Sequence, residues 1–149
     1  MSPQAAQAAH ESLMRDHIAP ALRERDFTGT SSSFRRQLPN GWHLLTFHGS
    51  HNASAGTALV TFDFAAITDA AWAERKVWYA EHTPAVKVPE KPTATWADSE
   101  RIGMVRMGLD QWYEYKPTAD LAALCVRILK DIDRYATPYM EKRVPSKGK

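Results

Sequence analysis

The stretch TALVTFDFAA, residues 57–66, decides the fold. Its apolar and polar residues alternate, with Val60, Phe62 and Phe64 set against Thr61 and Asp63. A repeat of two residues is the period of a β-strand whose two faces meet different surroundings. We therefore predict a strand over 57–66 with one buried apolar face, and we expect Asp63 on the opposite face.

Two segments before this strand have the same character. Residues 30–38 and 42–49 are β-compatible, and Pro39-Asn40-Gly41 between them is a turn sequence, because proline presets one φ and Asn and Gly tolerate positive φ. Residues 49–56 are small and polar and predict a second turn. The simplest arrangement is a meander of three antiparallel strands.

The rest of the chain alternates helical and strand patterns. Apolar residues at helical spacing predict an N-terminal helix, which Pro20 should kink or divide, and a C-terminal helix that begins at Pro117-Thr118 and stops at Pro138. Outside the meander, the predicted elements are helices over 3–26, 70–81 and 118–136, an irregular loop over 82–95, and strands over 102–109 and 111–115.

This order predicts an α+β fold. We expect a single antiparallel sheet of about five strands, a three-strand meander plus a later two-strand pair, packed against N-terminal, middle and C-terminal helices. The chain of 149 residues is near the usual size of one domain. We therefore predict one domain over residues 1–140 and a basic, disordered tail over 141–149.

Composition excludes several classes of protein. The formal charge is +2, which leaves no strong electrostatic footprint for nucleic acid, and the one cysteine, Cys125, allows no internal disulfide. The first residues do not have a signal-peptide pattern, and no apolar run is long enough for a membrane span. We expect a cytoplasmic protein with no membrane association and no cofactor.

Several short motifs resemble a bacterial family. They are Ile18-Ala19-Pro20-Ala21-Leu22 leading to Phe27, Phe34-Arg35-Arg36, the strand 42–47, Trp96 with Arg101-Ile102-Gly103, and Asp110-Gln111-Trp112-Tyr113. Together they resemble the domain-of-unknown-function family numbered 4304, over about residues 13–138. The resemblance implies an α+β domain without an established activity. Its occurrence among toxin–immunity gene clusters implies a protein-binding role, and it supplies no catalytic residues.

Aromatic side chains are the most informative candidates for a site. Five tryptophans in a domain of this size are many, and aromatic and arginine side chains are enriched in interfaces and ligand pockets. Large core residues are the alternative explanation. Arg36, on the face of Phe34, is either part of a buried ion pair or an anion anchor. The candidate binding residues are Arg36, Trp42, Trp72, Tyr79, Trp96, Trp112 and Tyr113.

Three histidines, His43, His48 and His51, are candidate metal ligands. His43 and His48 are five residues apart on one strand and should point to opposite faces. His48 and His51 can converge only if the chain turns there, so they are weak metal candidates and we expect no metal site. Cys125 falls on an apolar helical stripe and is expected to be buried rather than catalytic.

Three functions remain open. The first is a non-catalytic protein-binding module, immunity-like or dimerising, whose partner is another protein or a second copy. The second is a small-ligand protein with a pocket under residues 82–95, lined by aromatic residues and anchored by Arg36. The third is weak nucleic-acid binding through Arg35, Arg36, the basic tail and stacking aromatic side chains. The sequence does not decide whether the protein is an enzyme, and it favours a protein without catalytic activity.

Overall fold

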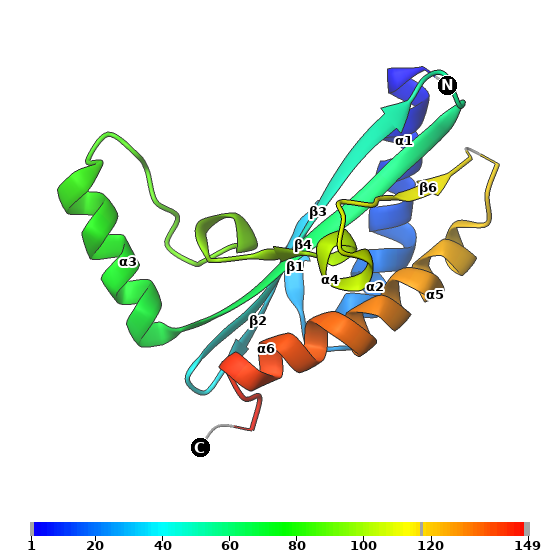
Figure 1. Cartoon of the computed structure of the whole chain (residues 1–149). Helices are drawn as coiled ribbons and strands as arrows, with labels where there is room; N and C mark the ends of the chain where they lie inside the picture. Colours follow the sequence, from blue (N-terminus) through cyan, green and yellow to red (C-terminus); the bar gives the residue numbers. More distant parts are fainter. Residues whose placement is uncertain (1, 117, 148–149) are drawn as a thin grey trace.

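One antiparallel sheet forms the centre of the molecule. The computed structural model describes residues 2–116 and 118–147. Strands β1 to β5 lie side by side in sequence order, and β6 also pairs with β4 (Figure 1). The strands are β1 (Thr28–Thr30), β2 (Ser33–Leu38), β3 (Gly41–Asn52), β4 (Thr57–Thr68), β5 (Glu100–Arg101) and β6 (Tyr113–Tyr115). The predicted α+β class with one antiparallel sheet is confirmed.

The long hairpin β3–β4 forms the centre of the sheet. The register runs from Gly41 opposite Thr68 to Asn52 opposite Thr57, so the strands continue to residue 52 where a turn from residue 49 was predicted. The predicted strand 30–38 is two strands, β1 and β2. They are joined at Ser31, which has a positive φ of 58°.

The N-terminal and C-terminal helices pass through their prolines without stopping. Pro20 follows the π turn η1 (Met14–Ile18) between α1 (Pro3–Leu13) and α2 (Ala19–Arg23). Pro138 follows the π turn η3 (Ile132–Ala136) between α5 (Leu121–Asp131) and α6 (Thr137–Arg143). Proline donates no hydrogen bond and its ring crowds the carbonyl four residues earlier. The wider π turn accommodates both problems.

The predicted helix ends near Pro138 and Thr118 are therefore wrong. Helix α6 extends to Arg143, and Val144 beyond it is 1% exposed, so disorder from residue 141 onward is wrong for this part of the tail. At the other end Asp120, rather than Thr118, caps α5 by accepting from the backbone N–H groups of Ala122 and Ala123. The predicted start at Pro117 lies outside the described residues.

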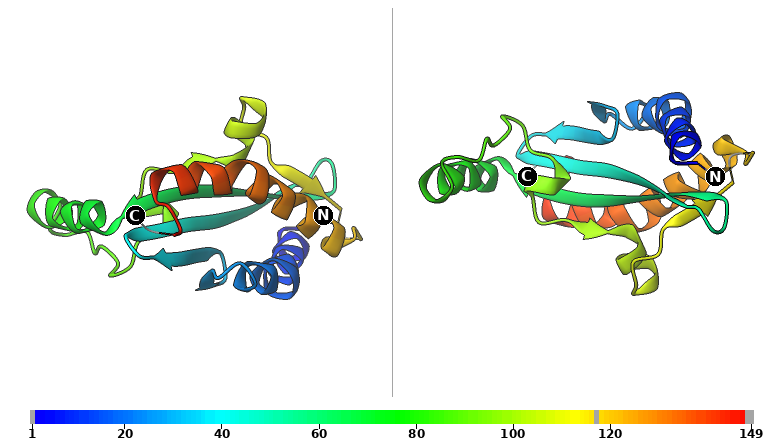
Figure 2. Two further views of the ribbon diagram at one scale, coloured as in Figure 1. Left: turned by 90° about the horizontal axis from the view of Figure 1, so that it is seen from below. Right: turned by 90° about the horizontal axis from the view of Figure 1, so that it is seen from above.

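One face of the sheet, named the closed face, carries the main core. Its alternating side chains from β2, β3 and β4 pack under α1, η1, α2, α5, η3 and α6 (Figure 2, left). The aromatic rings of Phe34, Phe47, Phe62 and Phe64 follow one another along it at centroid distances of 5.3–6.2 Å. The closed face consists of Phe34, Leu45, Phe47, Ala58, Val60, Phe62 and Phe64.

The other face of β3 and β4 is covered only at one end. There α3 (Asp69–His82) and the segment 88–97 pack on a smaller core that includes Trp42, Leu44, Ile67 and Trp72. Thr68 caps α3, close to the predicted start. Beyond this small core no helix lies over the strands in the described part of the chain (Figure 2, right). We name the remainder the open face: Thr46, His48, Ser50, Thr57, Leu59, Thr61 and Asp63.

Residues 102–107 form a helix, so the prediction of a strand over 102–109 is wrong. Helix α4 (Ile102–Met107) ends at Gly108, whose φ of 75° is the left-handed conformation typical of a helix C-terminus. Gly103 allows the chain to return closely, because a Cβ there would lie 2.5 Å from the backbone nitrogen of Gln111. The predicted two-strand pair consequently does not form: β5 and β6 each pair with β4.

Among the helices of residues 2–116 and 118–147, none is both long enough and apolar enough to span a membrane.

Candidate functional site

The predicted binding residues lie at three separate places. Arg36 lies on the closed-face side, at the end of the sheet near the C-terminus. Trp42, Trp72, Tyr79 and Trp96 gather with α3 on the other face. Trp112 and Tyr113 lie beside α4. The hypothesis of one aromatic pocket anchored by Arg36 therefore finds no support in the arrangement.

Arg36 packs against the closed-face core. Its guanidinium lies 4.7 Å from the Phe27 ring centroid and donates to the Arg25 carbonyl and to His43 Nδ1, at 3.1 and 2.8 Å. A guanidinium can only donate, so His43 Nδ1 accepts and the ring proton is on Nε2. Nε2 then donates to the Val144 carbonyl at 2.6 Å. Arg36 is thus a structural residue, held by hydrogen bonds rather than by the expected ion pair.

The α3 aromatics form the small core and attach the loop to the sheet. Trp72 is 4% exposed and donates from Nε1 to the Glu90 carbonyl at 3.1 Å. Tyr79 packs edge-to-face on Trp96 at 5.1 Å. Trp42 is buried against the same group. These residues behave as large core side chains, which was the alternative explanation at the sequence level.

The open face carries a chain of polar contacts centred on Asp63. The Asp63 carboxylate lies 2.8 Å from His48 Nε2 and accepts from Arg101 Nε at 2.9 Å. Arg101 also donates to Asp110 at 3.1 Å and lies 5.5 Å from the centroid of the Trp112 ring. Both oxygens of Asp63 are engaged, so this carboxylate orients the His48 and Arg101 side chains.

The strand pattern correctly predicts which histidines separate. His43 is buried under Val144 on the closed-face side, whereas His48 faces Asp63. His51 is three residues from His48 on the same continuous strand, so the two side chains point to opposite faces. The turn that their convergence would need is absent, because β3 runs through both residues. The described residues contain no group of three or more His, Cys, Asp or Glu placed to hold a metal.

Tyr113 and Arg106 hold α4 against the C-terminal helix. The Tyr113 hydroxyl donates to Asp131 Oδ2, which also accepts from Arg106 at 3.1 Å. Burial, with the Asp131 hydrogen bond, raises the pKa of Tyr113 above its ordinary value. Ile102 is fully buried. These contacts fix one side of α4 firmly.

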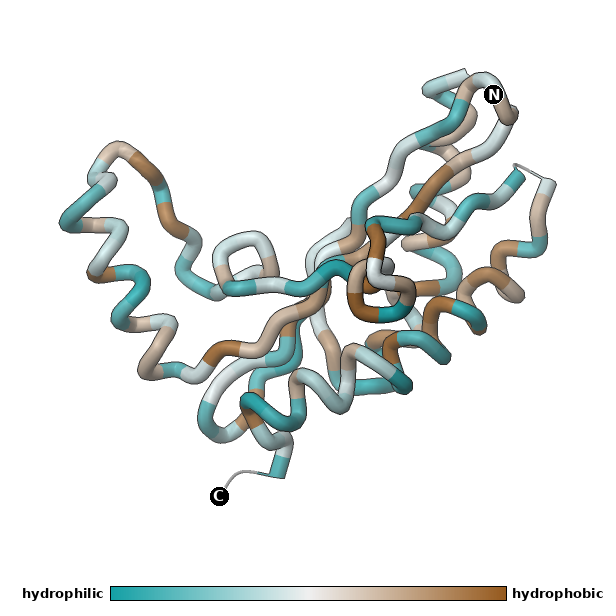
Figure 3. The backbone as a smooth tube through the Cα atoms, in the orientation of Figure 1, coloured by the Kyte–Doolittle hydropathy of each residue, from teal (hydrophilic) through white to brown (hydrophobic). Residues whose placement is uncertain are grey.

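The other side of α4 is apolar and exposed, a feature the strand prediction missed. Within six residues, four large apolar side chains have exposed fractions of 40–55%. Figure 3 shows this segment as a hydrophobic projection in front of the sheet. The missed signal was the spacing of Ile102 and Arg106 with Gly108 after them, which is typical of a short helix and its cap. The exposed apolar patch consists of Met104, Val105, Met107 and Leu109.

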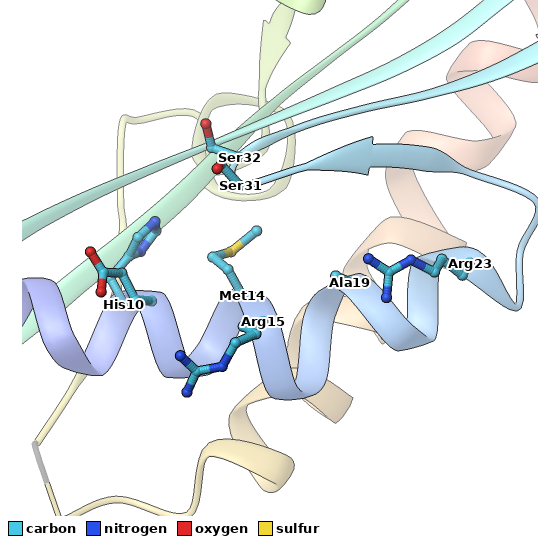
Figure 4. A pocket seen from close by; sticks show the side chains of 8 residues that line it. His10, Met14, Arg15, Ala19, Arg23, Ser31 and Ser32 are labelled. Atoms are coloured by element: carbon cyan, nitrogen blue, oxygen red, sulfur yellow. The ribbon is translucent and has the colours of Figure 1, made fainter.

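Two cavities of about 570 Å³ accompany these features. One lies beside the patch, between the open face and the segment 109–114, and includes Ser50, Leu59 and Trp112. The other lies between the N-terminal helix and the β1–β2 turn (Figure 4). The second, named the N-terminal cleft, is lined by His10, Glu11, Met14, Arg15, Ala19, Arg23, Ser31 and Ser32.

Comparison with known proteins gives no relative: no protein-family model, no curated protein and no solved structure matches this chain. The resemblance to the family numbered 4304 therefore stays a prediction.

Proposed function

We propose that this protein is a non-catalytic module that binds another protein through α4. The observation that carries the proposal is the apolar patch. Met104, Val105, Met107 and Leu109 are 48, 40, 53 and 55% exposed. Contiguous exposed apolar side chains are characteristic of surfaces that bind other proteins.

The patch is held in place rather than loosely exposed. Ile102 and Gly103 are buried beneath α4, and Arg106 is tied to Asp131 on its inner side. The apolar side chains therefore cannot turn inward without breaking these contacts. A rigid support for exposed apolar side chains lowers the entropy lost on binding.

The chemistry of the patch defines the partner. Two of its four members are methionines, whose unbranched side chains adapt to varied apolar surfaces. The adjoining cavity beside Trp112 has a polar rim that includes Asp110 and Glu114. The partner is thus a protein with an apolar surface bordered by hydrogen-bond donors or positive charge. A second copy of this chain is one possible source of such a surface.

Two groups that could have supported catalysis are already committed to structure. Asp63 shares its oxygens between His48 and Arg101. Burial raises the pKa of the Cys125 thiol, which disfavours the reactive thiolate. Both observations favour binding over catalysis.

Photo-cross-linking in the producing cells tests the proposal. Benzoylphenylalanine replaces Val105 in one variant and Val126 in a matched control, because Val126 on α5 is 53% exposed but lies outside the patch. We expect a discrete protein adduct from position 105 that is absent from position 126 and is abolished by Leu109→Glu. An adduct of twice the chain mass identifies a second copy. The same products at both positions, or none at 105, would overturn the proposal.

A further inference from the structure

We propose that the N-terminal cleft binds a small organic anion with an apolar body, with Arg23 as its anchor. This site lies on the N-terminal helix and the β1–β2 turn and is separate from the α4 patch. Its volume of about 570 Å³ is in the range of ordinary small-molecule sites, roughly 300–1,000 Å³. The proposal depends on the arrangement of charge, hydroxyl groups and apolar surface within it.

The π turn aligns the helical wall of the cleft. Glu11, Arg15, Ala19 and Arg23 all line it at a spacing of four residues. In a regular α-helix of 3.6 residues per turn, residues eight apart such as Arg15 and Arg23 drift away from a common face. The π turn over 14–18 takes up about one extra residue and restores the alignment. Such turns occur frequently at functional sites.

Arg23 supplies an uncompensated positive charge. Of the three arginines on this helical segment, Arg15 is paired with Asp16 at 2.9 Å and Arg25 with Asp133 at 3.1 Å. Arg23 makes no ion pair with any residue that the structure describes. The acidic residue of the cleft, Glu11, lies twelve residues away, or about 18 Å along a helix. An anion near Arg23 is therefore not repelled by it.

The β1–β2 turn presents hydroxyl groups across the cleft. Ser31 and Ser32 line the wall opposite the helix (Figure 4). The structure describes no hydrogen bond from either hydroxyl within residues 2–116 and 118–147. Ser31 adopts a left-handed φ of 58°, which is uncommon for a residue other than glycine and concentrates at functional positions. Figure 4 shows the two serines opposite Met14 and Arg23 further along the helix, so the hydroxyls are available to a polar group of the ligand apart from the one at Arg23.

The middle of the cleft is apolar. Met14 points from the helix toward the two serines, and Ala19 leaves room beside it (Figure 4). His10 closes the far end, and burial lowers the pKa of its imidazole, so a neutral ring lines that end at neutral pH. A ligand that places its acid group at Arg23 thus meets the accessible edges of Met14 and Ala19, which are 4 and 6% exposed.

Titration followed by amide NMR spectra tests the site with defined probes. Sodium octanoate is the amphipathic anion, inorganic phosphate tests the headgroup alone, and octylamine has the same chain with the opposite charge. The variants are Arg23→Gln, Ala19→Leu to fill the cleft, and Arg134→Gln as a control, since Arg134 is an exposed arginine outside the cleft. The dispersion of the spectrum reports whether each variant is folded.

We expect saturable shifts for octanoate confined to residues 10–23 and 31–32. Arg23→Gln should weaken binding at least tenfold, Ala19→Leu should remove it, and Arg134→Gln should leave it unchanged. If Ala19→Leu fails to fold, the comparison of Arg23→Gln with the control Arg134→Gln decides alone. The proposal is overturned if octanoate gives no saturable shift, if octylamine binds equally well, or if Arg23→Gln binds as the parent does. Phosphate binding as tightly as octanoate would refute the apolar contribution.

Discussion

The two faces of the sheet differ most clearly at the two histidines of β3. His43 is fully buried and both its ring nitrogens are hydrogen-bonded, to Arg36 and to the Val144 carbonyl. His48, five residues along the same strand, is partly exposed beside Asp63 on the open face. The contrast teaches that the closed face is buried throughout, while the open face buries its threonines and leaves His48, Ser50 and Leu59 at least partly exposed.

Deleting apolar side chains should show the largest difference between the faces. Leu45 is fully buried on the closed face, and Leu59 on the open face is only partly buried. We expect Leu45→Ala to lower the free energy of unfolding by about 2–5 kcal/mol, because the cavity it leaves cannot collapse fully. Leu59→Ala should cost less than about 1 kcal/mol. Urea unfolding of both variants measures this, and equal losses would contradict the distinction.

The two histidines give the next comparison. His43→Ala leaves the Arg36 guanidinium and the Val144 carbonyl without a partner in a buried place. The expected loss is about 1–3 kcal/mol. His48→Ala removes a part-exposed contact to Asp63, for which we expect no more than about 1 kcal/mol. A larger loss for His48 than for His43 in urea unfolding would reverse our assignment of the faces.

Acidification should act through the closed face. Burial lowers the pKa of His43, and the nearby Arg36 adds to this effect, while Glu141 and the Val144 carbonyl oppose it. The unfolded chain therefore binds a proton more readily, from about pH 6.5 downward. The contribution of neutral His43 to the free energy of unfolding is complete above that pH. It is lost as the pH falls toward the pKa of His43 in the folded protein, by up to about 1.4 kcal/mol per pH unit.

Urea midpoints at pH 7.5, 6.5 and 5.5 measure this dependence. His43→Gln should reduce this dependence and leave the part that comes from His10, whose pKa burial also lowers. His51→Gln, at the far end of β3, serves as the control and should leave the dependence as in the parent. A His43→Gln variant with the parental pH dependence would place the titration elsewhere.

The smallest expected effect concerns a hydroxyl of the open face. Thr61 is fully buried, and its Oγ1 has no hydrogen-bond partner among the described residues. Replacement by the isosteric valine removes the desolvation cost of this group, so Thr61→Val should raise the unfolding free energy by about 0.5–1.5 kcal/mol. Thermal unfolding checks the sign, and a clear loss of stability would mean that the hydroxyl is satisfied.

The sequence predicts the elements that depend on interactions between residues close together in the chain. Alternation of period two identified β4 and placed His43 and His48 on opposite faces, and Thr68 marked the start of α3. Pro138 misled, because a π turn before it lets the helix continue through hydrogen bonding that no propensity rule contains. The anchor from His43 to Val144 joins residues 101 positions apart, so a linear pattern could not disclose it.

The candidate site was predictable only in part. Trp112, one of the predicted binding residues, does lie beside the α4 patch. The patch itself was read as a strand, because Ile102, Val105 and Leu109 favour strands when tertiary packing is unknown. The pattern correctly predicts that Arg36 needs hydrogen-bonding partners, and these are the Arg25 carbonyl and His43 within the fold.

Methionine oxidation tests the central claim, that a partner covers the α4 patch, most directly. Met104 and Met107 are exposed, whereas Met14 and Met140 are buried in the closed-face core. A Val126→Met variant supplies a reference methionine at an exposed position on α5. In the purified protein, we predict that Met104 and Met107 react with peroxide about as fast as the methionine at position 126, and that Met14 and Met140 react slowly. In intact cells, the two α4 methionines should be protected relative to that reference; oxidation of all three at equal rates there would contradict the account.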